Sequence, residues 1–63
     1  MCESKIFIRR GGKETCVMEE AVKLVVGKNT VTCYDILGAK KEFAGARLAV
    51  ADLVGHKIIL EDS

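Results

Sequence analysis

Glycines divide this chain into short runs of residues that prefer an extended backbone, and this division constrains the fold more than any other feature. β-branched and aromatic side chains recur between the glycines, as in residues 4–9 and 30–36, and proline is absent. Glycine accepts the positive φ angles that tight turns need. Such runs, spaced about ten residues apart, are typical of strands joined by short turns. The pattern therefore predicts an all-β chain, a small antiparallel β-barrel of five to six strands.

The expected strands follow from these runs. Residues 4–9 and 14–18 form a first hairpin around the turn at 10–13, and further extended segments are expected at 22–26, 30–36, 41–43, 47–53 and 58–60. These seven segments supply the five to six strands of the expected barrel. Two segments are ambiguous, because Glu19 and Glu20 would suit a helix start and residues 47–53 could be helical by composition. Alternating apolar positions and the flanking glycines favour strands in both.

The length of the chain limits the size of its core and of any binding cleft. With 63 residues and no linker or repeat, it is one domain, residues 1–63. A chain this short buries only about 60% of the surface that its unfolded form exposes. It carries no Ser/His/Asp, paired-carboxylate or phosphate-loop signature. A core this small also leaves no room for a deep substrate cleft. We therefore expect a protein that is not an enzyme.

Alternation within each run predicts which side chains face the barrel interior. Residues 22–26 and 58–60 are apolar on both faces, so an apolar side remains uncovered, and a homodimer would cover it. The expected inward set is Ile6, Ile8, Val17, Leu24, Val26, Val31, Cys33, Phe43, Leu48, Val50, Ile58 and Leu60.

The charge is nearly balanced, with ten basic against nine acidic residues and a net charge of +1. A nucleic-acid-binding domain is usually strongly basic. Basic residues do gather at 5–13 and at 40–47, but acids are interleaved, which favours a solvated charged face. The chain has no apolar run of about 18 residues and no basic segment followed by an apolar one at its start. We expect no membrane contact and a cytoplasmic protein.

Cys2 is the residue that points most directly to chemistry. If Met1 is removed, the α-amine and thiolate of Cys2 close a five-membered chelate on a metal. If Met1 stays, its amine, the Cys2 amide nitrogen and the thiolate supply three donors. Sulfur with nitrogen in a planar arrangement suits nickel(II) or copper(II). The same residue also reads as a terminal thiol without a role.

The other candidate ligands have plainer interpretations. No Cys-x-x-Cys pair occurs, and three cysteines cannot close a disulfide framework. Cys16 and Cys33 fall inside expected strands, where free cysteine acts as a small buried hydrophobe. His56 follows Gly55 in an expected turn and is interpreted as a solvated histidine, with a role as an additional metal ligand left open.

Several segments together carry a family resemblance: the start Met1-Cys2-Glu3-Ser4-Lys5-Ile6-Phe7, residues 18–22 and 35–41, and the closing residues 52–53 and 56–60. Through them nearly the whole chain resembles the CooT family of small nickel-binding proteins. The resemblance implies a homodimeric barrel of Sm-like or Src-homology-3-like type that serves nickel insertion into carbon monoxide dehydrogenase. It also implies that Cys2 is the nickel(II) ligand, and that carbon monoxide dehydrogenase or its maturation factors are partners. Two Cys2 thiolates and nearby backbone nitrogens of a two-fold dimer would give four-coordinate nickel. The alternative is a small RNA-binding β-barrel protein, a label that relatives also carry by fold analogy.

Overall fold

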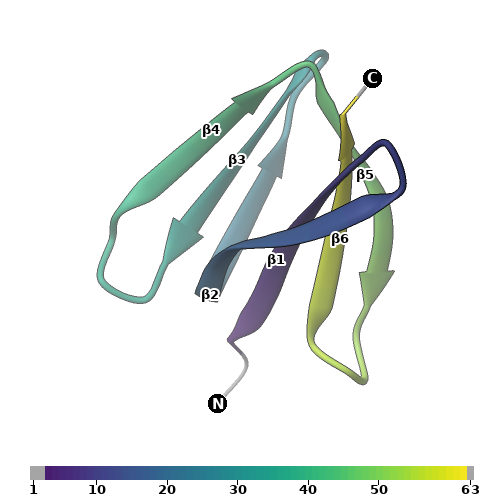
Figure 1. Cartoon of the computed structure of the whole chain (residues 1–63). Coiled ribbons are helices and arrows are strands. Elements are labelled where there is room, and N and C mark those ends of the chain that lie inside the picture. The colour runs from purple at the N-terminus through teal and green to yellow at the C-terminus, as the bar shows by residue number, and fades with distance from the viewer. Residues whose placement is uncertain (1–2, 63) are drawn as a thin grey trace.

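The computed structural model describes residues 3–62, and these form six strands without a helix (Figure 1). The strands are β1 (Ser4–Arg10), β2 (Lys13–Val26), β3 (Thr30–Asp35), β4 (Lys40–Ala44), β5 (Ala46–Asp52) and β6 (Lys57–Asp62). They make one sheet in the order β4-β3-β2-β1-β6-β5 that curls into a half-barrel. The expected all-β barrel class is confirmed. Within residues 3–62 no helix is long and apolar enough to cross a membrane.

The first hairpin forms where the sequence predicts it. Gly11 and Gly12 both have positive φ, at 55° and 81°, which a two-residue hairpin turn of the primed type requires. The turn sets Arg10 opposite Lys13 and Ile8 opposite Thr15.

β2 is much longer than expected, because one strand spans the ambiguous segment at residues 18–21. Its first half pairs with β1, and from Ala21 onward it pairs with β3. A register shift between Ala21 and Lys23 marks the point where it passes from one partner to the other. Bulges of this kind bend a strand, and this bend curls the sheet.

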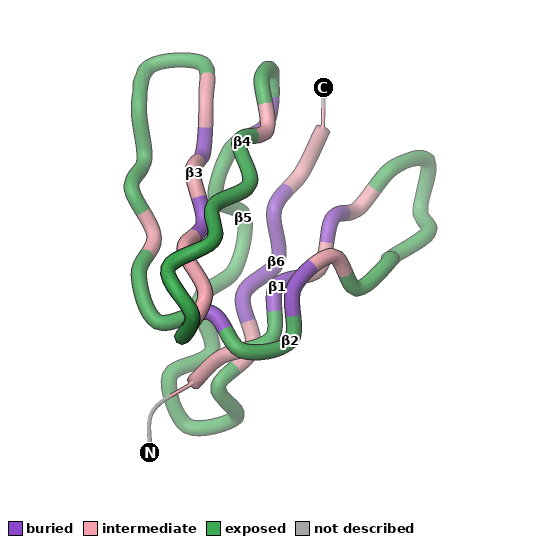
Figure 2. The backbone as a smooth tube through the Cα atoms, turned by 90° about the vertical axis from the view of Figure 1, so that its left-hand side faces the viewer, coloured by how far each residue is buried: buried purple, intermediate pink, exposed green. Residues whose placement is uncertain are grey.

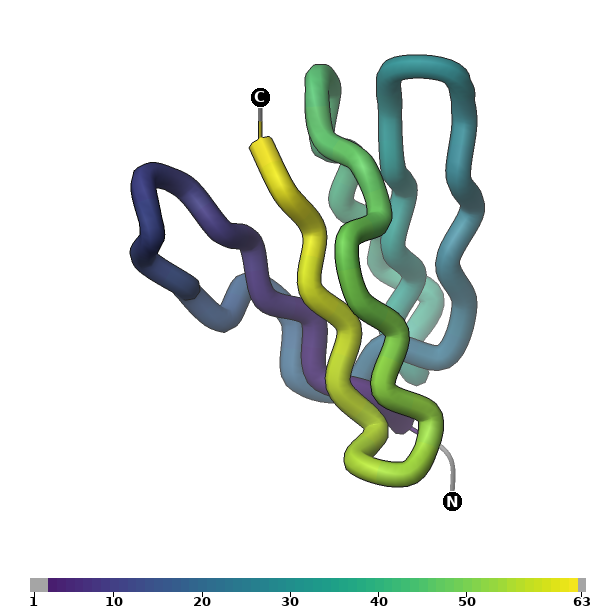
Figure 3. The backbone as a smooth tube through the Cα atoms, turned by 90° about the vertical axis from the view of Figure 1, so that its right-hand side faces the viewer, coloured from purple at the N-terminus to yellow at the C-terminus, as the bar shows by residue number. Residues whose placement is uncertain are grey.

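One pairing departs from the antiparallel expectation. β1 and β6 run parallel, with Ile6 opposite Ile58 and Ile8 opposite Leu60. Short turns force consecutive strands to be antiparallel, but no turn joins these two strands. Their direction follows from how the curled sheet brings the first and last strands together, as the tube in Figure 3 shows.

The core lies inside the curl and differs in part from the expected inward set. Of that set, Ile6, Ile8, Val31, Cys33, Ile58 and Leu60 are buried, and Val17, Leu24 and Phe43 pack against them while partly exposed. Val26, Leu48 and Val50 are exposed, so placing them inward was wrong. Met18, Ala21, Ala46 and Ile59 are buried instead.

The register shifts explain the corrections at Met18, Ala21 and Val50. Val26 and Leu48, by contrast, lie opposite the buried Val31 and Leu60. In β2 the buried side chains are Met18 and Ala21, three residues apart, because the irregular pairing breaks the two-residue alternation. A similar shift lies between Leu48 and Val50 in β5. β5 also ends the sheet, so no strand within residues 3–62 pairs with its second edge.

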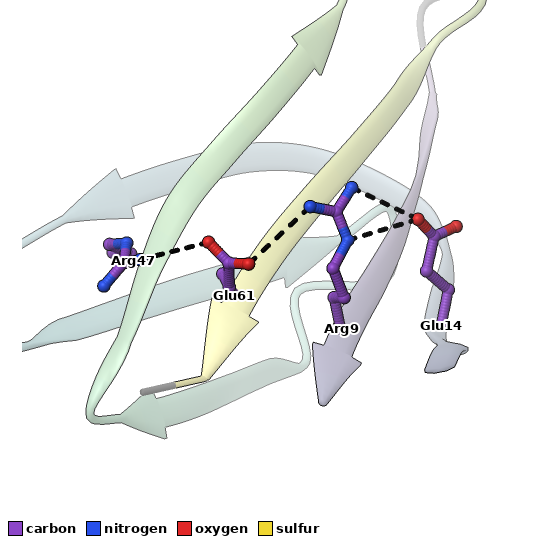
Figure 4. Close-up of polar contacts among 4 residues, drawn as sticks. All are labelled: Arg9, Glu14, Arg47 and Glu61. Carbon is purple, nitrogen blue, oxygen red and sulfur yellow. Dashed lines mark hydrogen bonds and ion pairs between the residues drawn. The ribbon is translucent and has the colours of Figure 1, made fainter. Parts of the chain in front are cut away.

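A row of charged side chains crosses β2, β1, β6 and β5 (Figure 4). The Arg9 guanidinium lies 3.3 Å from the Glu14 carboxylate and 3.7 Å from that of Glu61, and Arg47 lies 3.1 Å from Glu61. Exposed ion pairs of this kind each contribute about 0–1 kcal/mol. Their effect here is to pair the positive charge of this surface with carboxylates.

Candidate functional site

The end of the molecule where β1 begins is assembled from three segments that are distant in the sequence. Ser4 pairs with Ala21 of β2, and the Lys5 amide donates a hydrogen bond of 2.9 Å to the His56 carbonyl oxygen. The Ile36 amide donates a bond of 3.0 Å to the Glu20 carbonyl oxygen. These bonds fix the β5–β6 turn and the β3–β4 turn on either side of the start of β1, as Figure 1 shows.

Both turns present large apolar side chains to solvent. Leu37 in the β3–β4 turn is 87% exposed, and Leu53 and Val54 in the β5–β6 turn are 78% and 92% exposed. We call these three residues, together with Ile36 and His56, the amino-terminal rim. Single exposed hydrophobes are ordinary, but several gathered at one end of so small a chain indicate a contact surface.

The β3–β4 turn is held in shape by one side chain. Asp35 Oδ1 accepts hydrogen bonds of 2.9 Å from both the Leu37 and the Ala39 amides. An aspartate that caps its own turn in this way is common. In the turn held by these two bonds, the Leu37 side chain is exposed.

The described residues do not by themselves build a metal site. Within residues 3–62 there is no group of three or more His, Cys, Asp or Glu side chains that could hold a metal ion. Cys2, the predicted nickel ligand, lies outside the described residues. His56 lies at the rim with an exposed side chain, and its backbone has a positive φ of 53°.

The two remaining cysteines have different surroundings. Cys33 is fully buried in the core, as expected, and burial raises the pKa of its thiol above the ordinary value. Cys16 is exposed, so interpreting it as a buried hydrophobe was wrong. Its sulfur lies 3.7 Å from the Met18 carbonyl oxygen. The cause is the irregular stretch between Ile6 and Phe7, which places Met18 rather than Cys16 in the core.

The basic clusters noted in the sequence are largely occupied by other contacts. Arg10 Nε lies 2.6 Å from Asp62 Oδ2, Arg9 and Arg47 have the carboxylate partners of Figure 4, and Lys41 Nζ donates to the Val17 carbonyl oxygen at 2.8 Å. Phosphate contacts dominate affinity for nucleic acid. Pairing of the arginines with acids therefore favours the solvated-face interpretation over an RNA-binding surface.

Comparisons with known proteins identify the family. The model of the CO dehydrogenase accessory protein CooT matches residues 1–61. The chain belongs to the CooT family. The crystal structure of a candidate CooT from Carboxydothermus hydrogenoformans superposes with a TM-score of 0.85 at 32% identity, covering 98% of each chain. An uncharacterized protein of Archaeoglobus fulgidus is 52% identical over 44 residues, which is 70% of this chain and 96% of that protein.

Membership in the CooT family sets the coarse function. The family consists of accessory proteins for CO dehydrogenase, which supports a role in maturation of that enzyme rather than catalysis by this chain. The match to a solved structure over nearly the whole length confirms the half-barrel.

Sequence reasoning missed the amino-terminal rim, although a signal was present. In Leu37-Gly38 and in Leu53-Val54-Gly55, large apolar residues directly precede a turn glycine. Turns are normally polar because they face water. Apolar residues at such positions are therefore candidates for a surface that a partner covers.

Proposed function

We propose that this CooT-family protein binds nickel(II) through Cys2 and delivers it during maturation of carbon monoxide dehydrogenase in the cytoplasm. Family membership is the observation that carries the proposal. The donor chemistry agrees with it, because a terminal amine or amide nitrogen beside a cysteine thiolate suits nickel(II). Nickel is the cargo here and not a resident cofactor.

The shape of the amino-terminal end supports a site that can hand over its metal. Cys2 precedes Ser4 by two residues, and Ser4 begins β1 between two turns with exposed apolar tips. A delivery protein must present its ligand where a recipient can reach it. Ligands next to a contact surface meet that need better than ligands in the core.

A homodimer completes the proposed site. One thiolate with its neighbouring nitrogens leaves nickel short of protein donors, whereas two chains related by a two-fold axis supply two thiolates. The rim offers apolar area for this contact, with Leu37, Leu53 and Val54 almost fully exposed. We therefore place the dimer contact at the rim, where it would bring the two Cys2 residues together.

Metal titration tests the proposal directly. We expect nickel(II) to produce a thiolate-to-nickel charge-transfer absorption band in the wild-type protein and in Cys16→Ser. Cys16→Ser is a matched control, because Cys16 is an exposed thiol. Cys2→Ser should lose the band and the high-affinity binding while its circular dichroism stays unchanged. Full affinity in Cys2→Ser would refute the assignment.

A further inference from the structure

The half-barrel has an open side between the first half of β2 and β4. β1 covers one side of residues 13–17 in β2, but within residues 3–62 no strand pairs with their other side, since pairing with β3 begins at Ala21. β4 ends the sheet. In Figure 2 the β1–β2 hairpin projects away from the β3–β4 layer. The two elements approach where Lys41 Nζ reaches the Val17 carbonyl oxygen at 2.8 Å.

Beyond that contact the open side widens into a notch of about 370 Å³. Ile8, Val17 and Phe43 form its apolar floor, and Arg10, Lys13 and Thr15 form its polar border. This volume lies within the range of binding pockets, roughly 300–1,000 Å³. It is large enough for a bulky side chain and too open to be a closed core cavity.

The two charged residues that line the notch, Arg10 and Lys13, are both positive. Arg10 is held by its 2.6 Å ion pair with Asp62. Lys13 is exposed and forms no ion pair with any of residues 3–62. An occupant with a carboxylate near the hairpin turn would therefore find a cation that has no competing partner.

The spacing of the β2 residues that line the notch indicates the side-chain pattern of the occupant. Lys13, Thr15 and Val17 alternate along β2 and all line the notch. A strand added beside them would also alternate, so its residues i, i+2 and i+4 would share this face. An acidic residue opposite Lys13 and a bulky apolar residue near Val17 and Phe43 would then lie on one face of that strand.

We propose that the notch binds an extended segment of a partner protein that pairs with residues 13–17 of β2. The segment carries an acidic and a bulky apolar side chain an even number of residues apart. Main-chain hydrogen bonds to an exposed strand edge provide affinity in this mode of recognition, and side-chain pockets provide selectivity. The notch and the amino-terminal rim use different residues, so one protein has separate surfaces for nickel and for this partner.

Blocked hexapeptides provide the probes. Acetyl-Glu-Thr-Thr-Thr-Phe-Thr-amide places its acidic and aromatic side chains on one face of a strand. Acetyl-Thr-Glu-Thr-Thr-Phe-Thr-amide has the same composition but places them on opposite faces. Each is titrated into metal-free protein while NMR follows chemical shifts and amide exchange. We expect the first peptide to slow exchange at residues 14–16, to shift Phe43 and to bind about tenfold more tightly than the second, or about 1.4 kcal/mol.

A pair of lysine variants completes the design. Lys13→Glu should weaken binding of the first peptide by about tenfold or more, whereas Lys28→Glu, at an exposed lysine in the β2–β3 turn, should bind it as the wild type does. A version of the peptide with N-methylated backbone amides should not bind, because it cannot pair with the strand edge.

Three results would overturn the proposal. Equal binding of the two hexapeptides would mean that the notch does not require the acidic and aromatic side chains to share one face of a strand. Shifts confined to residues 36–37 and 53–56 would place the contact at the rim. A dimer of the free protein that Lys13→Glu dissociates would show that a second copy occupies the notch. Repeating the titration in Cys2→Ser separates this proposal from the nickel assignment, because peptide binding should be unchanged there.

Discussion

The Lys5 amide and the His56 carbonyl oxygen are joined by a hydrogen bond of 2.9 Å. The bond links the second residue of β1 to the turn that enters β6, and it belongs to the parallel pairing in which Lys5 lies opposite Lys57. His56 forms it with a positive φ of 53°, a conformation that costs a non-glycine residue about 1 kcal/mol or more. The beginning of β1 is therefore held in place by a strained turn.

Replacing His56 by glycine should stabilise the fold, because glycine adopts this φ without the steric cost. We expect the free energy of unfolding to rise by about 0.5–1 kcal/mol in urea denaturation, and nickel affinity to stay at the wild-type value. His56→Ala keeps a Cβ and should show no such gain. Equal loss of nickel binding in both variants would instead show that the His56 imidazole is a nickel ligand.

Burial of the Cys33 thiol predicts a pH dependence of stability. The pKa of this thiol is raised above its ordinary value of 9.0 in the folded protein, so the unfolded chain loses the thiol proton first as pH rises. The stabilisation is fully present below pH 9 and decreases above it, towards the folded-state pKa. We expect Cys33→Ala to lower the unfolding free energy by about 1 kcal/mol at pH 7. The variant should also lose the part of the stability decrease above pH 9 that ionisation of the Cys33 thiol causes.

Cys16→Ala is the matched control for that measurement. Its thiol is exposed in the folded protein, so removing it should leave both the stability at pH 7 and the loss above pH 9 close to wild type. A wild-type pH profile in Cys33→Ala would show that the decrease at high pH arises elsewhere.

Nickel affinity should fall as the solution is acidified. A thiol and an amine or amide nitrogen must lose protons to bind the metal, and free thiols lose theirs only in mildly alkaline solution. Competition by protons should therefore weaken binding progressively from pH 9 to pH 6 in isothermal calorimetry. A profile that is flat down to pH 7 would point to imidazole and carboxylate ligands and contradict the Cys2 site.

The rim residues should control self-association without controlling the fold. Leu37 and Leu53 are 87% and 78% exposed, so the double variant Leu37→Ser/Leu53→Ser should keep its unfolding free energy within about 0.5 kcal/mol. Sedimentation equilibrium with nickel should give twice the chain mass of 6.9 kDa for the wild type and a mass shifted towards 6.9 kDa for the variant.

Val26→Ser is the control for the rim variant. Val26 is an exposed apolar residue, 55% accessible, at the far end of β2 from the rim. Its replacement should leave the dimer intact. If it dissociates the dimer while the rim variant does not, the interface lies on the β2–β3 side and the placement of the dimer contact at the rim is wrong.

The sequence alone determined the local structure of this protein. Gly11 and Gly12 specify the first turn because few other residues tolerate two consecutive positive φ angles. The β-branched runs specify strands, and burial of Cys33 follows from its place in an alternating run. The family was also evident from the sequence, because its characteristic residues begin the chain.

Only the tertiary structure decided which strands meet and which side chains face the core. The parallel pairing of β1 with β6 joins strands that no turn connects, so no local signal encodes its direction. The shift beside Phe7 leaves Cys16 exposed, and the shift between Leu48 and Val50 places these two side chains on opposite faces of β5. Val26 lies opposite the buried Val31 and is exposed at the end of β2. A single irregular residue reverses the face of each later side chain in a strand. Such shifts are set by how the whole sheet curls to bury Ile6, Val31 and Leu60 together, which no short segment of sequence can specify.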